Sequence, residues 1–248
     1  MAIQIRPANR SQSKLRLGIS GPAGSGKTYS AILLASGIAP LEKVVFLDTE
    51  NGSASMYSDL GKYNVATMSP PYSPEAFISA IKECEDAGME VIVIDSASME
   101  WSGPGGVLDI HGKLLGNSFT NWAKVTPRHD AFIQAILQSK CHIIACTRRK
   151  SDYSVDKDSQ GKTTITKVGL AAVQRDSFEF ELTTEFILDQ VHMTTVGKDR
   201  TGIWMDKPSF QITKGTGKVL LDWCNSGAKP DLPGVPDIIK EDVRQAIK

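Results

Sequence analysis

The sequence lacks an excess of charge of either sign. Its 248 residues carry 28 lysines and arginines against 28 aspartates and glutamates, so the formal net charge at pH 7 is zero. A global attraction to polyanions is therefore excluded, and any contact with nucleic acid must come from a local basic patch. Balanced charge also argues against a protein that coats DNA constitutively.

Paired cysteine and histidine motifs are missing as well. None of the four cysteines has C-x-x-C spacing, and the four histidines are not spaced as metal ligands. Cys141 and Cys146 fall in an apolar segment, where a thiol is most simply a small core side chain. We therefore expect reduced cysteines and a cytoplasmic location. No nucleophilic serine motif occurs, so only phosphoryl-transfer chemistry has visible support.

Long hydrophobic runs are also absent. No apolar stretch approaches the roughly 20 residues that cross a bilayer, and the first residues lack the apolar centre of a signal peptide. We expect no contact with a membrane. The 41% hydrophobic content still suffices for one α/β core. We divide the chain into a polar leader at 1–13, a core at 14–225, and a proline- and glycine-rich linker with a short helix at 226–248.

What the sequence does contain is a complete phosphate-binding motif, G-x-x-x-x-G-K-[ST], after a short apolar strand. Its glycines let the backbone curl around an anion, so that successive N–H groups and the positive end of the next helix converge on phosphate oxygens. Lys27 would reach the β- and γ-phosphates of ATP, and the Thr28 hydroxyl would bind Mg²⁺. The expected nucleotide-binding residues are Gly21, Pro22, Ala23, Gly24, Ser25, Gly26, Lys27 and Thr28.

The pattern around this motif predicts an α/β fold. Apolar strands alternate with helical stretches, which is typical of a mostly parallel central sheet flanked by helices. We predict strands at 15–20, 43–48, 91–95 and 141–147, and helices from 27 and over 74–87 and 122–138. After these we expect a mobile polar loop at 149–162, antiparallel strands at 185–189, 191–196, 202–205 and 210–213, and a terminal helix at 237–247.

Two of the predicted strands end in acidic residues. The strand at 91–95 has the pattern of a Walker B strand and delivers Asp95 to the Mg²⁺ shell. Serine follows Asp95 where some ATPases have a catalytic glutamate, so a base for hydrolysis must come from elsewhere. Asp48 and Glu50 lie two residues apart and are expected to point to the same side of an extended strand. Either carboxylate could orient water at the γ-phosphate.

These strand ends resemble those of RecA-like ATPases. Residues 46–51, Phe-Leu-Asp-Thr-Glu-Asn, resemble the strand that ends in Asp-x-Glu in that family, and residues 91–96 resemble its Walker B strand with the Asp-Ser ending. The resemblance implies that Glu50 is the catalytic base. It covers about residues 14–205 and implies a RecA-like P-loop core that assembles head to tail, as a ring or as a filament.

Two further segments extend the resemblance. Arg148 ends the strand at 141–147, where RecA-like proteins sense the γ-phosphate, often with glutamine. An arginine could donate a bidentate pair to that phosphate or simply begin a basic loop surface. Lys198 and Arg200 resemble the Lys-x-Arg pair that the family presents to the ATP of a neighbouring subunit. Such cations would neutralise charge on the transferred phosphoryl group and make hydrolysis depend on assembly.

The family places its DNA contacts in loops after the Walker B and sensor strands, which are residues 96–121 and 149–167 here. The second loop interleaves basic residues with a tyrosine, so it could follow a phosphate backbone while the ring stacks on a base. The candidate DNA-binding residues are Arg149, Lys150, Tyr153, Lys157 and Lys162. A surface loop without a ligand is the alternative.

The short chain looks most like the compact RecA-related ATPases of bacteriophages that accompany single-strand annealing recombination. That resemblance implies a DNA-stimulated ATPase with ATP and Mg²⁺ as its ligands, acting on single-stranded DNA in the bacterial or phage-infected host cytoplasm. It also implies a homo-oligomer and a recombination or single-strand-binding protein as partner.

Two other functions stay open. One is a P-loop kinase for a small molecule, with Asp48 as base and Arg148 or Arg149 as lid arginine. The other is a nucleotide-gated scaffold that hydrolyses little ATP. A GTPase is disfavoured because no N-K-x-D segment occurs, and a ParA-like protein because the additional lysine early in its phosphate loop is absent.

Overall fold

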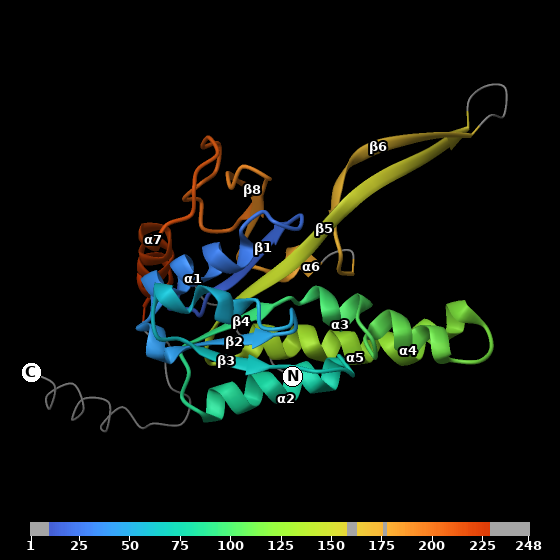
Figure 1. Cartoon of the computed structure of the whole chain (residues 1–248), viewed down its shortest axis with the longest axis horizontal. Helices are drawn as coiled ribbons and strands as arrows, with labels where there is room; N and C mark the ends of the chain where they lie inside the picture. Colours follow the sequence, from blue (N-terminus) through green and yellow to red (C-terminus); the bar gives the residue numbers. More distant parts are fainter. Residues whose placement is uncertain (1–9, 158–162, 176–177, 229–248) are drawn as a thin grey trace, which may run out of the picture.

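The computed structural model describes residues 10–157, 163–175 and 178–228, and between residues 151 and 171 it describes the backbone alone (Figure 1). The strands are β1 (Arg16–Gly21), β2 (Val44–Asp48), β3 (Asn64–Thr67), β4 (Val91–Asp95), β5 (His142–Lys157), β6 (Thr163–Ala172), β7 (Thr184–Leu188) and β8 (Thr194–Asp199). The α-helices are α1 (Lys27–Ile38), α2 (Pro74–Asp86), α3 (Ser98–Ser102), α4 (Val107–Lys113), α5 (Ser118–Gln138), α6 (Phe178–Glu181) and α7 (Lys214–Asn225). Two 3₁₀ helices, η1 (Leu41–Lys43) and η2 (Ala54–Leu60), flank β2. The helix predicted at 237–247 lies outside the described residues.

The strands form one eight-stranded sheet in the order β3-β2-β4-β5-β1-β7-β8, with β6 paired to β5 off this path. Neighbours from β3 to β7 run parallel, and β8 is antiparallel to β7. The predicted α/β fold with a mostly parallel sheet and antiparallel C-terminal strands is therefore confirmed. One detail differs, because β7 was expected to be antiparallel and runs parallel to β1.

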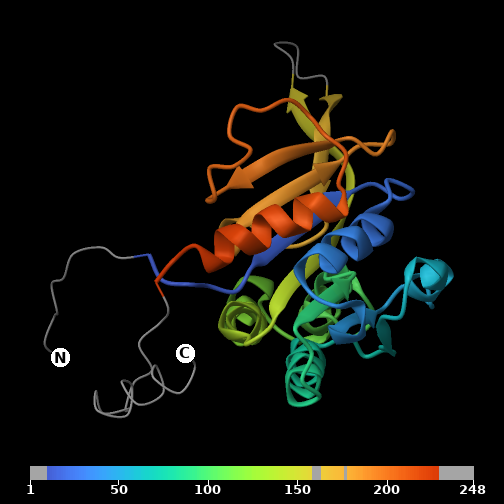
Figure 2. The same ribbon diagram turned by 90° about the vertical axis from the view of Figure 1, so that its left-hand side faces the viewer.

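Helices cover both faces of the sheet. Successive apolar side chains of a strand point to opposite faces, so both faces must be covered. On β2, Phe46 is buried with residues of α1 and α7, whereas its neighbour Leu47 is buried on the other face with residues of α2 and α5. Figure 2 shows α1 and α7 side by side on one face, with α2 and α5 on the opposite one. Among the described residues, no helix combines the length and the apolar character needed to span a bilayer.

The last two predicted strands do not form, and the helix α7 that follows them was not predicted. Residues 202–205 form no strand, and of residues 210–213 only Phe210 makes a single bridge, to Thr194. Residues 214–225 form a helix that is capped by Thr213. The glycines in this segment disfavour a helix in isolation, because glycine gains the most conformational freedom on unfolding.

A long β-hairpin replaces the predicted polar loop. β5 continues to Lys157 and pairs with β6 in antiparallel register, with an irregularity between Asp152 and Tyr153. Figure 1 shows the hairpin projecting from the sheet well beyond the helical layers. A hairpin outside the core has no face that must be apolar, and its few apolar residues gave only a weak strand signal. Residues 96–121 were likewise expected as a loop, and they contain α3, α4 and the start of α5.

Candidate active site

Four parallel strands bring the predicted site residues to one edge of the sheet. In the register of these strands, Asp48 lies beside Asp95 and Gly21 lies beside Arg148. Ligands of such sheets bind at the carboxyl ends of the strands. A cavity of about 970 Å³ opens at this edge. Its lining includes Lys27, Thr28, Glu50, Asp95 and Arg148.

The phosphate loop links β1 to α1 in a shape that its glycines allow. Gly24 and Gly26 have φ angles of 78° and 84°, in the left-handed region that side chains rarely adopt. Helix α1 begins at Lys27, so the unpaired N–H groups of its first turn lie at the cavity. Lys27 Nζ donates to the carbonyls of Gly21 and Pro22 at 3.1 and 2.9 Å. These bonds keep the ammonium group at the loop.

Thr28 and Asp95 form the candidate magnesium site. The Thr28 hydroxyl donates to Asp95 Oδ2 at 2.6 Å, so an oxygen from α1 and a carboxylate from β4 meet beside the phosphate loop. Burial raises the pKa of Asp95 to about 6, although the hydrogen bond from Thr28 opposes that shift. This donor set fits Mg²⁺, which commonly takes one or two protein oxygens and completes its shell with phosphate and water. In the described part of the chain, no cluster of three or more His, Cys, Asp or Glu side chains offers another metal site.

Asp48 and Glu50 do not point the same way, which corrects the expectation from their spacing. β2 ends at Asp48, and the chain turns there. The Asp48 carboxylate is fully buried and accepts the N–H groups of Glu50 and Ala54 at 2.6 and 3.2 Å. Asp48 therefore fixes the turn after β2, and its oxygens are engaged. Glu50 alone of the two lines the cavity.

Arg148 binds Glu50 inside the cavity. Its Nε donates to Glu50 Oε1 at 2.8 Å, and its Nη2 donates to Oε2. Burial would raise the pKa of Glu50, but the hydrogen bonds and positive charge of Arg148 outweigh burial and lower it below its ordinary value. The Arg148 backbone is held from two sides: its N–H donates to Ser98 Oγ at 2.9 Å, and its carbonyl accepts the N–H of Val173 at 2.7 Å.

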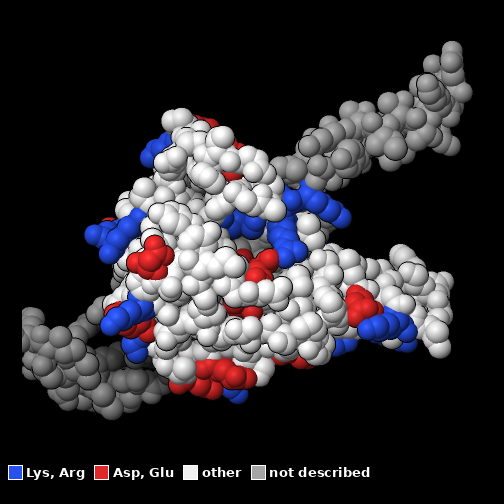
Figure 3. Space-filling view, in the orientation of Figure 1, with Lys and Arg blue, Asp and Glu red and all other residues white. Residues whose placement is uncertain are grey.

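Basic side chains continue along β5 at the foot of the hairpin. Arg149 and Lys150 line the same cavity as Arg148. Arg149 Nη1 donates to Ser20 Oγ at 3.2 Å and lies 3.6 Å from Glu185 Oε1. Figure 3 shows Lys and Arg side chains gathered at the foot of the hairpin, directly above acidic side chains in the hollow of the surface. The cavity therefore carries charge of both signs.

The other three candidate DNA-binding residues fall on the hairpin itself. Tyr153 and Lys157 lie on β5, where the backbone is described and the side chains are not. Lys162 lies outside the described residues. Of this predicted set, side-chain geometry is therefore known for Arg149 and Lys150.

The turn between β7 and β8 holds the phosphate loop from the outside. His192, at a φ of 65°, brings its Nδ1 within 3.1 Å of the Ser25 carbonyl. Gln190 Nε2 donates to the Ala23 carbonyl at 3.3 Å. The sequence showed no metal-ligand spacing for His192, and it gave no reason to single out Gln190. No spacing links them to the loop, because the contact depends on β7 pairing with β1.

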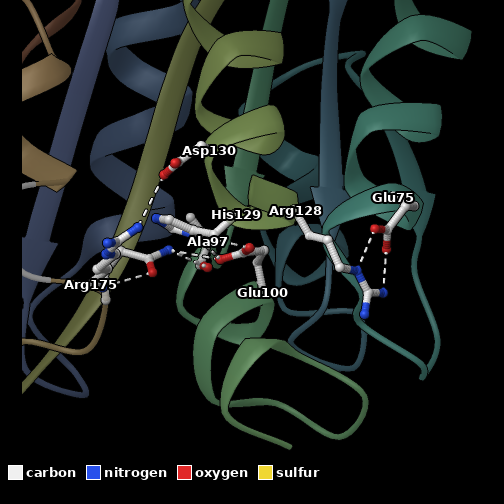
Figure 4. A network of polar contacts seen from close by, with 8 residues as sticks. Glu75, Ala97, Glu100, Arg128, His129, Asp130 and Arg175 are labelled. Atoms are coloured by element: carbon white, nitrogen blue, oxygen red, sulfur yellow. Dashed lines mark hydrogen bonds and ion pairs between the residues drawn. The ribbon is translucent and has the colours of Figure 1, made fainter. Parts of the chain in front are cut away.

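A buried polar network lies behind the site and was also missed. Glu100 and His129 are buried, and His129 Nδ1 lies 3.1 Å from Glu100 Oε1 (Figure 4). Gln174 Nε2 donates to the Ala97 carbonyl at 3.1 Å and lies 3.5 Å from Glu100 Oε2. Burial raises the pKa of Glu100, although His129 opposes that shift. Gln174 follows β6, so this network ties the return strand of the hairpin to the turn after Asp95.

Lys198 and Arg200 lie away from the cavity of their own chain. The register of β8 places Lys198 opposite Glu185, near the amino end of β7, and neither cation is among the described residues that line the cavity. Lys198 Nζ donates to the carbonyl of Glu179 at 3.0 Å and to that of Phe180, and Arg200 donates to Phe180 at 2.7 Å. Both cations thus meet the carbonyl groups of α6, while Arg200 remains exposed.

Comparison with known proteins gives one family. No protein in a curated set matches the chain. A family model described as an AAA domain matches residues 13–209, which contain the phosphate loop, Asp95 and the strands that carry them. The match spans most of the chain, so it covers the whole nucleotide-binding core and not the phosphate loop alone. The chain belongs to this AAA domain family, and it is a P-loop ATPase that binds nucleotide with Mg²⁺.

Proposed function

We propose that this ATPase is RecA-like, assembles head to tail, and acts on single-stranded DNA in phage recombination or repair. The observation that carries the hydrolytic part is the position of Glu50. It lines one cavity together with the phosphate loop and the Thr28–Asp95 pair. A carboxylate there can orient a water for attack on the γ-phosphorus.

Each residue of the cavity has a role in this proposal. Lys27 binds the β- and γ-phosphates, while Thr28 and Asp95 hold Mg²⁺, which neutralises phosphate charge when it is bound. Glu50 orients the water and accepts its proton, and Arg148 binds the γ-phosphate with its two-pronged guanidinium group. Lys198 and Arg200 serve the site of a neighbouring subunit, in agreement with their distance from their own cavity.

The apolar part of the cavity suits the nucleobase. Tyr29 and Tyr57 line it, with ring centroids 5.8 Å apart, and Ile212 lines it as well. Aromatic and aliphatic side chains provide the flat apolar surface on which a base stacks. Phosphates and base can therefore occupy one continuous cavity.

The hairpin is our candidate for the DNA contact. Arg149 and Lys150 stand where it leaves the sheet, and strands rich in polar and basic residues can follow a phosphate backbone. The foot of the hairpin contacts the proposed catalytic residues, because the N–H of Val173, just after β6, donates to the Arg148 carbonyl. This connection gives DNA on the hairpin a physical route to the ATP site.

The direct test is ATP turnover with and without single-stranded DNA, alongside the mass of the protein in solution. We expect turnover that rises with DNA and an assembly larger than a monomer. Lys27→Ala should lose nucleotide binding, whereas Glu50→Gln should bind nucleotide and lose turnover. Unchanged turnover in Glu50→Gln would remove the assignment of the base, and a monomer indifferent to DNA would remove the recombination role.

The scaffold function keeps one observation in its favour. Arg148 engages both oxygens of Glu50, and a carboxylate in this pair is not free to hold water. A scaffold would show the same slow turnover in the wild type and in Glu50→Gln. The kinase function is disfavoured, because the Asp48 carboxylate that it needs as base is buried and engaged by two N–H groups.

A further inference from the structure

The Glu50–Arg148 pair places two groups with opposite tasks in direct contact. Glu50 must hold water through a free oxygen, and Arg148 must bind the terminal phosphate through free N–H groups. In the structure each group satisfies the other through two hydrogen bonds. Neither task can be performed while this pair is intact.

The contact between Glu50 and Arg148 involves side-chain atoms alone. The Arg148 backbone is fixed by Ser98 Oγ and by Val173, whereas about half of its side-chain surface is exposed, at 49%. The guanidinium group can therefore leave Glu50 by rotation of its own side chain, without movement of β5. Lys27 and Thr28 line the same cavity, so a terminal phosphate bound there lies within the region that the Arg148 side chain can sweep.

A phosphate and a carboxylate are alternative partners for the same guanidinium fork. Both present oxygens at a spacing that matches two parallel N–H donors, and the phosphate carries more charge. We expect only a triphosphate to bring such a group to Arg148, because this motif holds the β-phosphate in the loop and the γ-phosphate lies beyond it.

We infer that Arg148 determines specificity for the triphosphate by exchanging Glu50 for the γ-phosphate, and that this exchange frees the Glu50 carboxylate only when a hydrolysable phosphate is present. The inference rests on the proposed role of Glu50 as the base. ADP leaves the pair intact and the site inactive. ATP breaks the pair, places Arg148 on the γ-phosphate and leaves both Glu50 oxygens open to water.

The test is a double-mutant cycle on nucleotide binding, which needs no turnover. The affinities for ADP and for the non-hydrolysable β,γ-imido analogue of ATP are measured with Mg²⁺ by calorimetry in the wild type, Glu50→Gln, Arg148→Ala and the double variant. Without the competing carboxylate, Glu50→Gln should bind the triphosphate about fivefold more tightly, the size expected for a partly exposed ion pair. Its affinity for ADP should be unchanged.

The double variant separates exchange from simple charge repulsion. Removing a negative charge near the γ-phosphate would tighten triphosphate binding whether or not Arg148 is present. The exchange predicts that Glu50→Gln has no such effect in the Arg148→Ala background. An effect that persists there, or no effect in the wild-type background, overturns the inference.

Two further controls complete the design. Arg148→Met replaces Arg148→Ala in the same cycle if the alanine variant does not fold, because methionine keeps an unbranched side chain and removes the charge and the N–H donors. The proposed function fails separately, if the wild type shows this binding pattern and yet hydrolyses no ATP with any DNA.

Discussion

His142 is a buried, neutral side chain at the start of β5. Its Nδ1 accepts the N–H of Leu15 at 3.1 Å, and burial lowers its pKa to about 4, with further lowering from Lys14 and Arg16. The unfolded chain binds a proton at this residue below about pH 6.5, and the folded chain does not until about pH 4. Stability therefore falls as the pH drops through that window.

We expect the free energy of unfolding to decrease by about 2 to 3 kcal/mol from this residue between pH 7 and pH 4. His142→Asn keeps an acceptor near the position of Nδ1 and removes the titration. Urea unfolding of both proteins at pH 7, 5.5 and 4.5 measures the difference. The variant should lose less stability on acidification than the wild type, and parallel losses would show that His142 is not responsible.

Among single residues, those that belong to contiguous motifs could be predicted from the sequence. The phosphate loop could be predicted from the sequence because it depends on glycines at fixed positions, and the structure places it between β1 and α1. The difference between Asp48 and Glu50 was not predicted, since it depends on where β2 ends. The Glu50–Arg148 pair joins residues 98 positions apart, and no spacing rule reports such a contact.

Helix α7 packs on α1 through two glycines. A Cβ at Gly217 would stand 2.1 Å from the Leu34 carbonyl oxygen, and one at Gly37 would stand 2.2 Å from the Lys214 carbonyl oxygen. These contacts involve backbone atoms that cannot yield without separating the helices. We expect Gly217→Ala to lower the free energy of unfolding by about 3 kcal/mol, although alanine is the better helix former by about 1 kcal/mol.

Gly215 provides the matched control within the same helix. It is exposed, and a Cβ there meets only the Thr213 side chain, at 3.3 Å. Gly215→Ala should therefore leave stability unchanged or raise it by up to about 1 kcal/mol. Chemical denaturation of the two variants decides the matter. Equal effects at both positions would mean that glycine acts through backbone freedom rather than through close packing.

The elements that the sequence missed share a physical cause. The glycines of α7 allow close contact with α1, but they lower the helix propensity of the segment. Packing against α1 stabilises the helix in spite of this low propensity. In β5 and β6 the strands extend beyond the core, so no buried face imposes an apolar pattern. The central strands were predicted because both of their faces are buried. A strand buried on both faces has a continuous run of apolar residues, which is visible in the sequence.

Across the whole molecule, the proposed catalytic groups fall into two sets at different positions along the strands. Glu50, the phosphate loop and Asp95 stand at the carboxyl ends of the parallel strands, whereas Lys198 lies near the amino end of β7. In the structure one chain does not bring both sets to the cavity, because Lys198 and Arg200 contact the carbonyl groups of α6 and do not line it. A second chain can, if it stacks head to tail, and the rotation between subunits then decides between a closed ring and an open filament.

Mixing two inactive variants tests this arrangement. Arg200→Ala keeps Glu50 and loses a cation, while Glu50→Gln keeps the cations and loses the base. In an equal mixture, about one interface in four joins an intact Glu50 to an intact Arg200 from the neighbouring chain. We expect each variant alone to show little turnover and the mixture to recover up to about a quarter of the wild-type rate. Recovery should increase with protein concentration, because it requires contact between chains. A mixture no more active than its components, in assemblies of wild-type mass, would place Arg200 outside the shared site.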